Sequence, residues 1–152
     1  MDALLDEGLT CLTVLDVSAA ALDRARVRLG SRGDGVRWMT EDVTSDWRCP
    51  PVDVWHDRAA FHFLVEPADR SRYVEALKRV LKPSGYAIIA TFAEDGPSRC
   101  SGLPVVRHSV ESLGAELGTD FSLVQSERHD HTTPGGTVQQ FMFAVFHRTA
   151  AH

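Results

Sequence analysis

Three aspartates of the 152-residue chain lie at or just after the end of a short apolar segment. They are Asp16 in Thr10–Val17 (TCLTVLDV), Asp42 after Val36–Thr40 (VRWMT) and Asp57 after Val52–His56 (VDVWH). In an open α/β sheet, ligands bind beyond the carboxyl ends of the strands, where a carboxylate can accept hydrogen bonds from two hydroxyl groups. The structural alternatives are a solvated Asp16 that caps the following helix and an Asp42 that is an ordinary loop acid. Glu41 would replace Asp42 if the register shifted by one residue.

The segment around Asp57 offers groups for proton transfer and for anion binding. Asp57 and His62 are candidate general bases for a substrate that must lose a proton, and the Arg58 guanidinium could hold a substrate carboxylate. The alternatives are an ion pair between Arg58 and a neighbouring acid, and a His62 side chain that is satisfied on a helix face. Phe61 is a candidate pocket residue, although aromatic residues at such spacing more often belong to the core.

Histidines and cysteines raise the question of a metal site. His129 and His131 flank Asp130, which would put both imidazoles on one face of a strand, but no second pair of ligands completes a site. We therefore expect no metal and interpret these residues as the polar end of a hairpin. The three cysteines are odd in number and widely spaced, which is typical of reduced thiols rather than a disulfide framework; they are Cys11, Cys49 and Cys100.

Composition and charge exclude several classes of protein. The chain is 43% hydrophobic, which is enough for a folded core, and its length fits a single domain over residues 1–152. Its apolar runs fall far short of the roughly 20 residues of a membrane span. The 16 Lys and Arg against 21 Asp and Glu give a net charge of −5, which argues against nucleic acid as a partner. The first seven residues include no basic residue and are not a signal peptide, so we expect a cytoplasmic protein.

The elements that would position these side chains alternate between strand and helix. A helical period of apolar residues predicts helices over 19–29, Asp69–Leu81 and Ser109–Leu117. Besides the three apolar segments above, strands are predicted over Tyr86–Phe92, Phe121–His129 and Val138–Arg148. Ser18 can cap the first helix and Gly30 can end it, and the last two strands would form an antiparallel hairpin. This order of elements predicts an α/β sheet that is mostly parallel.

Four segments, in this order, carry a resemblance to a known family. They are TVLDVSAAALDRAR, RWMTEDV, VDVWHDRAAFHFL and YVEALKRVLKPSGYAIIATF. With these segments the chain resembles the class I S-adenosylmethionine-dependent methyltransferases, and the loop FAEDGPSRCSGLPV is most similar to that of the small bacterial members. The most telling single piece is LKPSG followed by an apolar strand, and the resemblance covers nearly the whole chain.

The resemblance implies a Rossmann-like sheet with the strand order 3-2-1-4-5-7-6, in which strand 7 is antiparallel. The six predicted strands of this chain correspond, in chain order, to strands 2 to 7 of the family. No GxGxG occurs among the eleven glycines, and the family's first strand would precede Thr10. We therefore expect an α/β, Rossmann-like methyltransferase sheet that is mostly parallel, ends in an antiparallel hairpin and has its first strand absent.

The resemblance also implies which residues bind the cofactor, S-adenosyl-L-methionine. Asp16 corresponds to the acid that binds the ribose, with Val17 and Ser18 beside the adenosine. Asp42 would accept a hydrogen bond from the adenine amino group, and the Val43 backbone N–H would reach a ring nitrogen.

The next segment would lie beside the methyl group that is transferred. By resemblance, Asp57 contacts the cofactor and, together with His62, is a candidate catalytic residue. Arg58 and Phe61 are candidates for binding the methyl acceptor. The loop that follows the fifth strand contributes Ser101 and Gly102 to the same acceptor site.

Two functions of different classes follow from this comparison. The first is methyl transfer from S-adenosylmethionine to a small-molecule or protein acceptor. The alternative is a catalytically inactive methyltransferase-like protein that self-associates or binds a partner, because the chain contains no glycine-rich cofactor turn. Unpaired strand edges next to the absent first strand favour association, so we also expect a two-fold homodimer.

Overall fold

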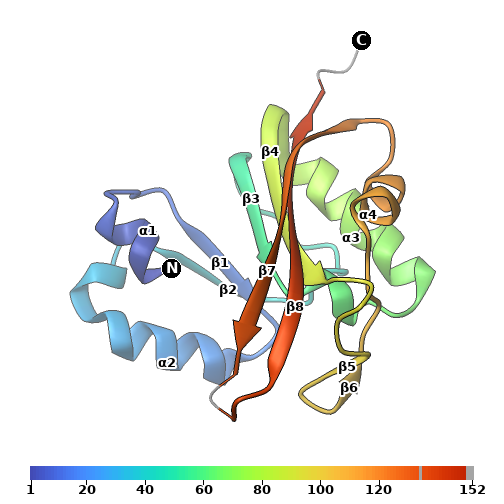
Figure 1. Ribbon diagram of the computed structural model, residues 1–152. Helices are drawn as coiled ribbons and strands as arrows, with labels where there is room; N and C mark the ends of the chain where they lie inside the picture. Colours follow the sequence, from blue (N-terminus) through green and yellow to red (C-terminus); the bar gives the residue numbers. More distant parts are fainter. Residues whose placement is uncertain (134, 150–152) are drawn as a thin grey trace. The chain divides into compact units, whose positions relative to one another are not determined.

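The computed structural model describes residues 1–133 and 135–149. The chain forms two compact units, unit 1 (Met1–Trp47) and unit 2 (Arg48–His152). Figure 1 shows the elements of both units, coloured from blue at the N-terminus to red at the C-terminus. Within the described residues, no helix has both the length and the apolar character that crossing a bilayer requires.

Unit 1 holds a two-stranded parallel sheet and the helices next to it in sequence. Its elements are helix α1 (Asp2–Asp6), strand β1 (Thr13–Asp16), helix α2 (Ala19–Leu29), 3-10 helix η1 (Gly30–Gly33) and strand β2 (Arg37–Thr40). The Ser18 side chain accepts a hydrogen bond from the Ala21 N–H at 3.2 Å, so Ser18 caps α2 as the sequence predicts. Leu22 and Leu29 form the buried side of α2.

Unit 2 is built on a four-stranded sheet. Its strands are β3 (Val52–Arg58), β4 (Leu81–Phe92), β7 (Phe121–Thr132) and β8 (Val138–Arg148), and their order across the sheet is β3-β4-β8-β7. Strands β3 and β4 are parallel, whereas β8 is antiparallel to both β4 and β7. This topology confirms the order 4-5-7-6 and the terminal hairpin that the resemblance implies.

Helices α3 (Pro67–Val80) and α4 (Val110–Leu117) lie to the right of this sheet in Figure 1 and cover one of its faces. Alternate residues of β4 and β8 point to this helix-covered face, and all of them are buried; they are Ala87, Ile89, Thr91, Met142, Ala144 and Phe146. Fully buried side chains of the two helices, including Tyr73, Leu77, Leu113 and Leu117, complete this core. The remaining elements are 3-10 helix η2 (Phe61–Phe63) and a hairpin of β5 (Arg99–Cys100) and β6 (Leu103–Pro104).

The opposite side of the sheet, here called the second face, is less buried. Its apolar residues on β3, β4 and β8 are Val54, Tyr86, Ile88, Ala90, Phe92, Phe141, Phe143 and Val145. Near the amino end of β4, Val54 and Tyr86 are 51% and 43% exposed. Towards the carboxyl end of β4 this face is buried, because Ala59, Cys100 and Val105 pack against it.

The start of helix α3 and the start of strand β4 differ from the boundaries predicted from the sequence. Helix α3 begins at Pro67, two residues before the predicted start, because the missing N–H of proline is not needed in the first turn. Strand β4 begins directly at Leu81, so residues 82–85, which lie between the predicted helix and the predicted strand, belong to β4. The pairing with β3 is irregular there, and its register passes from Val52 opposite Leu81 to Val54 opposite Tyr86.

Other boundaries differ by a few residues. Strand β1 is shorter than the predicted Thr10–Val17, β3 extends two residues beyond His56, and β7 extends three residues beyond His129. The loop predicted after the strand Tyr86–Phe92 contains the β5–β6 hairpin. These differences arise because pairing across a sheet, rather than local composition, decides where a strand ends.

A substitution at Gly85 tests whether β4 packs closely against β3 at this position. A Cβ added there would lie 2.8 Å from the Asp53 carbonyl oxygen and 2.9 Å from the Lys82 carbonyl oxygen, so we expect Gly85→Ala to lower the free energy of unfolding by about 1–3 kcal/mol. The control is Gly114→Ala in α4, where the added Cβ would be 3.6 Å from the Phe146 ring and alanine favours the helix. Urea unfolding measures both variants, and a Gly85→Ala protein as stable as the parent would contradict this packing.

Candidate functional site

In unit 1, strands β1 and β2 end at the same edge of their sheet. Asp16 lies opposite Thr40 in the parallel register. The Glu41 backbone N–H donates to the Asp16 carbonyl oxygen at 3.2 Å. Asp16 and the segment that follows β2 are therefore neighbours, which is the arrangement expected from the two strand-end acids.

The Asp16 carboxylate is half-buried at the end of β1. Its Oδ1 accepts a hydrogen bond from the Ser18 N–H at 2.8 Å, so Asp16 orders the turn into α2. Its Oδ2 has no donor among the residues that the structure describes. Val17, between them, is 74% exposed, which leaves an apolar side chain and one carboxylate oxygen available to a ligand at this edge.

Asp42 orders the turn that follows β2. Its Oδ1 accepts from both the N–H and the Oγ1 hydroxyl of Thr44, each at 2.8 Å. The Val43 carbonyl oxygen accepts from the Trp47 indole N–H at 3.1 Å. The carboxylate of Asp42 is exposed, Val43 is half-buried, and Glu41 is exposed beside them.

Unit 1 also has a hollow towards the amino end of β2. Its lining residues include Arg26, Gly33, Asp34 and Trp38, and its volume is about 310 Å³. The Arg26 guanidinium lies 5.3 Å from the centre of the Trp38 ring. Trp38 of this hollow is opposite Val14 in the register, two residues before the pair of Asp16 and Thr40 at the carboxyl ends of β1 and β2.

In unit 2, Asp57 is a buried carboxylate near the end of β3, with 6% of its surface exposed. Its Oδ1 accepts from the Ala60 N–H at 2.8 Å, and its Oδ2 accepts from the Phe61 N–H at 3.0 Å and from the Tyr73 hydroxyl at 2.7 Å. Burial raises the pKa of Asp57, while the three hydrogen bonds act in the opposite direction. The carboxylate thus fixes the turn after β3 and links it to α3.

Tyr73 is the residue of this network that sequence reasoning missed. It accepts a hydrogen bond from the Trp55 indole N–H at 2.7 Å while it donates to Asp57. Its burial, together with the neighbouring carboxylate, raises its pKa well above 10, so the hydroxyl keeps its proton. The helical period of α3 indicates only that Tyr73 is a core residue, and nothing in the sequence indicates which acid it meets.

His62 and Phe61 are both fully buried. The His62 Nδ1 accepts from the Phe92 N–H at 3.3 Å, and its buried Nε2 has no partner among the described residues. Burial, with a smaller effect of the nearby His108, lowers the pKa of His62 to about 4, so the imidazole is neutral at pH 7. The Phe61 ring lies 4.8 Å from the Tyr73 ring in an edge-on contact. Their expected roles in catalysis and in acceptor binding stay predictions.

The other acceptor-site candidates lie at exposed positions of unit 2. Arg58 is exposed at the end of β3 and is followed by Ala59 in the left-handed region, with φ 67°. Ser101 and Gly102 form the exposed turn between β5 and β6, with φ 49° and 81°. The Arg99 guanidinium donates to the Gly102 carbonyl oxygen at 2.7 Å and holds this turn.

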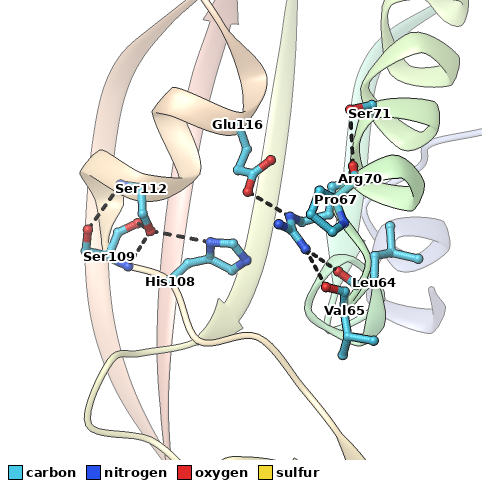
Figure 2. Close-up of polar contacts among 9 residues, drawn as sticks. All are labelled: Leu64, Val65, Pro67, Arg70, Ser71, His108, Ser109, Ser112 and Glu116. Atoms are coloured by element: carbon cyan, nitrogen blue, oxygen red, sulfur yellow. Dashed lines mark hydrogen bonds and ion pairs between the residues drawn. The ribbon is translucent and has the colours of Figure 1, made fainter.

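A second polar cluster joins α3 to α4 (Figure 2). The half-buried Arg70 contacts Glu116 at 2.7 Å and donates to the carbonyl oxygens of Leu64 and Val65, each at 2.9 Å. Ser112 and His108 lie next to each other in Figure 2, with 3.4 Å between Oγ and Nδ1.

The Ser112–His108 pair does not form an activated nucleophile. The Ser112 hydroxyl donates to the Ser109 carbonyl oxygen at 3.1 Å and accepts from the Ser109 N–H at 3.0 Å, as part of the capping box of α4. The cluster therefore has a structural role. Among residues 1–133 and 135–149, no group of three or more His, Cys, Asp or Glu side chains is arranged to hold a metal ion.

Comparison with known proteins gives a consistent result. A family model described as "Methyltransferase domain" matches residues 1–85. No curated protein sequence matches the chain. Because the structural matches that follow are all below 25% identity, they establish the likeness of the fold.

Three solved structures illustrate this likeness. The N-methyltransferase NodS from Bradyrhizobium japonicum WM9 is 17% identical, with a TM-score of 0.72 over 91% of this chain and 74% of that one. The 1,6-didemethyltoxoflavin-N1-methyltransferase of Burkholderia thailandensis, with bound 1,6-didemethyltoxoflavin and S-adenosylhomocysteine, is 20% identical, with a TM-score of 0.73 over 98% and 65%. The glycopeptide N-methyltransferase MtfA, complexed with S-adenosyl-L-methionine, is 16% identical, with a TM-score of 0.71 over 99% and 77%.

The buried Asp57 network can be tested by an isosteric change. In Asp57→Asn, one of the two carboxylate oxygens becomes an amide nitrogen that cannot accept a hydrogen bond, so at least one of the three buried donors loses its acceptor. We therefore expect the free energy of unfolding to fall by about 1–3 kcal/mol. The control is Asp53→Asn on the same strand, where an exposed ion pair with Lys82 contributes little. Equal stability of the two variants in denaturant titrations would show that the Asp57 hydrogen bonds do not hold β3 to α3.

Proposed function

The chain belongs to the methyltransferase domain family, and from this premise we propose that it transfers a methyl group from S-adenosyl-L-methionine to a small-molecule or protein acceptor. The observation that carries this proposal is the pair of acids, Asp16 and Asp42, at the shared carboxyl end of β1 and β2. The fold likeness to enzymes whose structures contain S-adenosylmethionine or S-adenosylhomocysteine supports the choice of cofactor.

The residues of unit 1 fit the adenosine part of this cofactor. The Asp16 Oδ2 has no donor among the described residues, so it can accept a ribose hydroxyl while Oδ1 keeps the Ser18 N–H. The exposed Val17 can pack against the adenosine. Asp42, whose turn is already ordered by Thr44, can accept from the adenine amino group, with the Val43 N–H directed to a ring nitrogen.

The bound cofactor would supply a methyl group that is attached to a positively charged sulfur. The methyl group would pass directly to a nucleophile of the acceptor, with no covalent bond to the protein. The chain's own contribution is then mainly to bind and orient. We assign Asp57 as a positioning residue, because three donors already occupy its carboxylate. Arg58, Ser101 and Gly102, which are exposed, are the proposed contacts to the acceptor in unit 2. His62 and Phe61, which lie in η2 after Arg58, are fully buried and contact Phe92 and Tyr73 in the core.

Cofactor binding by Asp16 can be measured directly. Asp16→Ala removes a charge-assisted acceptor for the ribose, so we expect its affinity for S-adenosylhomocysteine to fall by about 10-fold to 100-fold in isothermal titration calorimetry. Asp16→Asn retains an acceptor for the Ser18 N–H and should also bind more weakly, which separates ligand binding from loss of the local turn. Asp23→Ala, which removes an exposed acid of α2 paired with Arg26, is the matched control.

Two outcomes would contradict the proposal. A parent chain that does not bind S-adenosylhomocysteine would contradict the cofactor assignment. Binding by both Asp16 variants that equals the parent would contradict the role of Asp16 at the ribose.

Self-association is a second candidate function, favoured by the two edges of the sheet in unit 2. Strand β7 at one edge exposes the charged residues Glu127, Arg128 and Asp130 beside Ser126. Charged side chains on an edge strand discourage pairing with another strand. Strand β3 at the other edge exposes Val54. We propose that β3 pairs with β3 of a second copy, because a two-fold axis makes one open edge complementary to itself.

This pairing predicts a dimer that a charge on β3 disrupts. Multi-angle light scattering at about 10 μM should give twice the 16.8 kDa of the chain, and Val54→Lys should give a monomer, because lysine on an edge strand opposes pairing. Val124→Lys on β7, at a valine of similar exposure (56%), should remain dimeric. A monomeric parent, or a dimer in the Val54→Lys variant, would contradict the proposal.

A further inference from the structure

One corner of the second face is built almost entirely from aromatic rings. It lies where β4 ends, and the hairpin of β7 and β8 continues past it in Figure 1. The residues concerned are Phe141 and Phe143 of β8 with His129 and His131 of β7, here called the aromatic platform. The register places Phe143 opposite Ala90, Phe141 opposite Phe92, and His129 opposite Phe141, so all of these share one face.

The rings of the platform contact one another in fixed geometry. The His129 ring stands edge-on to Phe143 and the His131 ring edge-on to Phe141, each with 6.3 Å between ring centres. Phe141 is also edge-on to the buried Phe92 at 4.8 Å. The deeper rings are therefore anchored in the core, while Phe143 and His131 are half-buried and His129 is exposed.

Close backbone contacts join the start of β8, which carries the platform phenylalanines, to the loop after β4. The Ala93 N–H donates to the Gln140 carbonyl oxygen at 2.9 Å. A Cβ added to Gly96 would lie 2.9 Å from the same oxygen, so only glycine allows this approach. The loop after β4 is thus fixed against the start of β8, and Cys100 packs on the same cluster.

Two charged groups of the hairpin lie on the face opposite the platform, whereas Glu127, which is opposite Phe143 in the register, lies on the platform face and is exposed. Arg128, on the opposite face of β7, forms an ion pair with Asp95, and Asp130 also alternates onto that face. The accessible part of the platform consists of the half-buried Phe143 ring and two imidazoles, which combine flat apolar surface with hydrogen-bonding nitrogen atoms, whereas Phe141 is buried. This chemistry suits a flat aromatic molecule that carries a hydroxyl or amino group better than it suits an anion or an aliphatic chain.

We propose that the aromatic platform binds the methyl acceptor, and that this acceptor is a planar aromatic or heteroaromatic small molecule. The proposal rests on the proposed function and names the class of substrate for it. The position of the platform supports this assignment, because ligands of such sheets bind beyond the carboxyl ends of the strands. Arg58 is the last residue of β3, and the turn at Ser101 belongs to the segment that follows β4. The imidazoles would hydrogen-bond the polar group of the ring, while Phe143 packs against its face.

The test uses 2-naphthol as an aromatic probe and cyclohexanol as its aliphatic counterpart. Saturation-transfer NMR with the full chain should detect 2-naphthol and not cyclohexanol, and a titration should show binding weakened at least about fivefold in the double variant His129→Ala/His131→Ala. Asp130→Ala is the matched control, because it lies between the two histidines on the opposite face and should bind like the parent. Phe143→Leu, which keeps an apolar side chain, should weaken 2-naphthol binding without unfolding the sheet.

The outcomes separate this proposal from the proposed function. Absence of 2-naphthol binding, equal binding of cyclohexanol, or a double variant that binds like the parent would overturn the platform, even if S-adenosylhomocysteine binds. Selective binding of 2-naphthol that is lost in the double variant supports the platform. If the same parent protein fails to bind S-adenosylhomocysteine, that failure contradicts the proposed cofactor and leaves the platform as an aromatic-binding surface. Calorimetry with S-adenosylhomocysteine on the double variant should match the parent.

Discussion

The buried carboxylate of Asp57 is the group on which the arrangement of unit 2 depends. A carboxylate removed from water is unfavourable unless hydrogen bonds compensate it, and here three donors do so from the turn after β3 and from α3. Tyr73 extends the network back to Trp55 on β3. Strand, turn and helix are therefore fixed by one group, and any change in its hydrogen bonds alters all three.

The turn that Asp57 holds also positions the end of β4. It carries His62, whose Nδ1 accepts from the Phe92 N–H and whose carbonyl oxygen accepts from the Val106 N–H at 2.8 Å. The His108 N–H in turn donates to the Phe92 carbonyl oxygen at 3.0 Å. Phe92 is thereby held on both sides, and its ring supports Phe141 in the aromatic platform. A continuous set of contacts therefore connects the buried Asp57 carboxylate to the aromatic platform, the proposed acceptor surface.

Local sequence signals predicted the elements well, whereas contacts between distant residues could not be read from the sequence. Capping preferences predicted the role of Ser18, and the continuous apolar run predicted β4. The family resemblance predicted the strand order of unit 2. Pro83 and Gly85 indicate an interruption after the helix, but β4 continues through residues 82–85, because Leu81 and Tyr86 on either side of them both pair with β3. The sequence identified Asp57 as an acid near the end of a strand. Its hydrogen-bond partner Tyr73 lies 16 residues away, so the sequence could not show that the Asp57 carboxylate already has donors from the tertiary fold.

The central claim is that the carboxyl ends of β1 and β2 bind the adenosine part of the cofactor. Titration of the ¹⁵N-labelled chain with S-adenosylhomocysteine, followed by backbone amide chemical shifts, tests it most directly. The account predicts that the largest shifts in unit 1 occur at Val17, Ser18, Val43 and Thr44, with little change at Gly33 and Trp38 in the hollow at the other end of β2. Shifts centred on that hollow, or no shifts in unit 1, would contradict it.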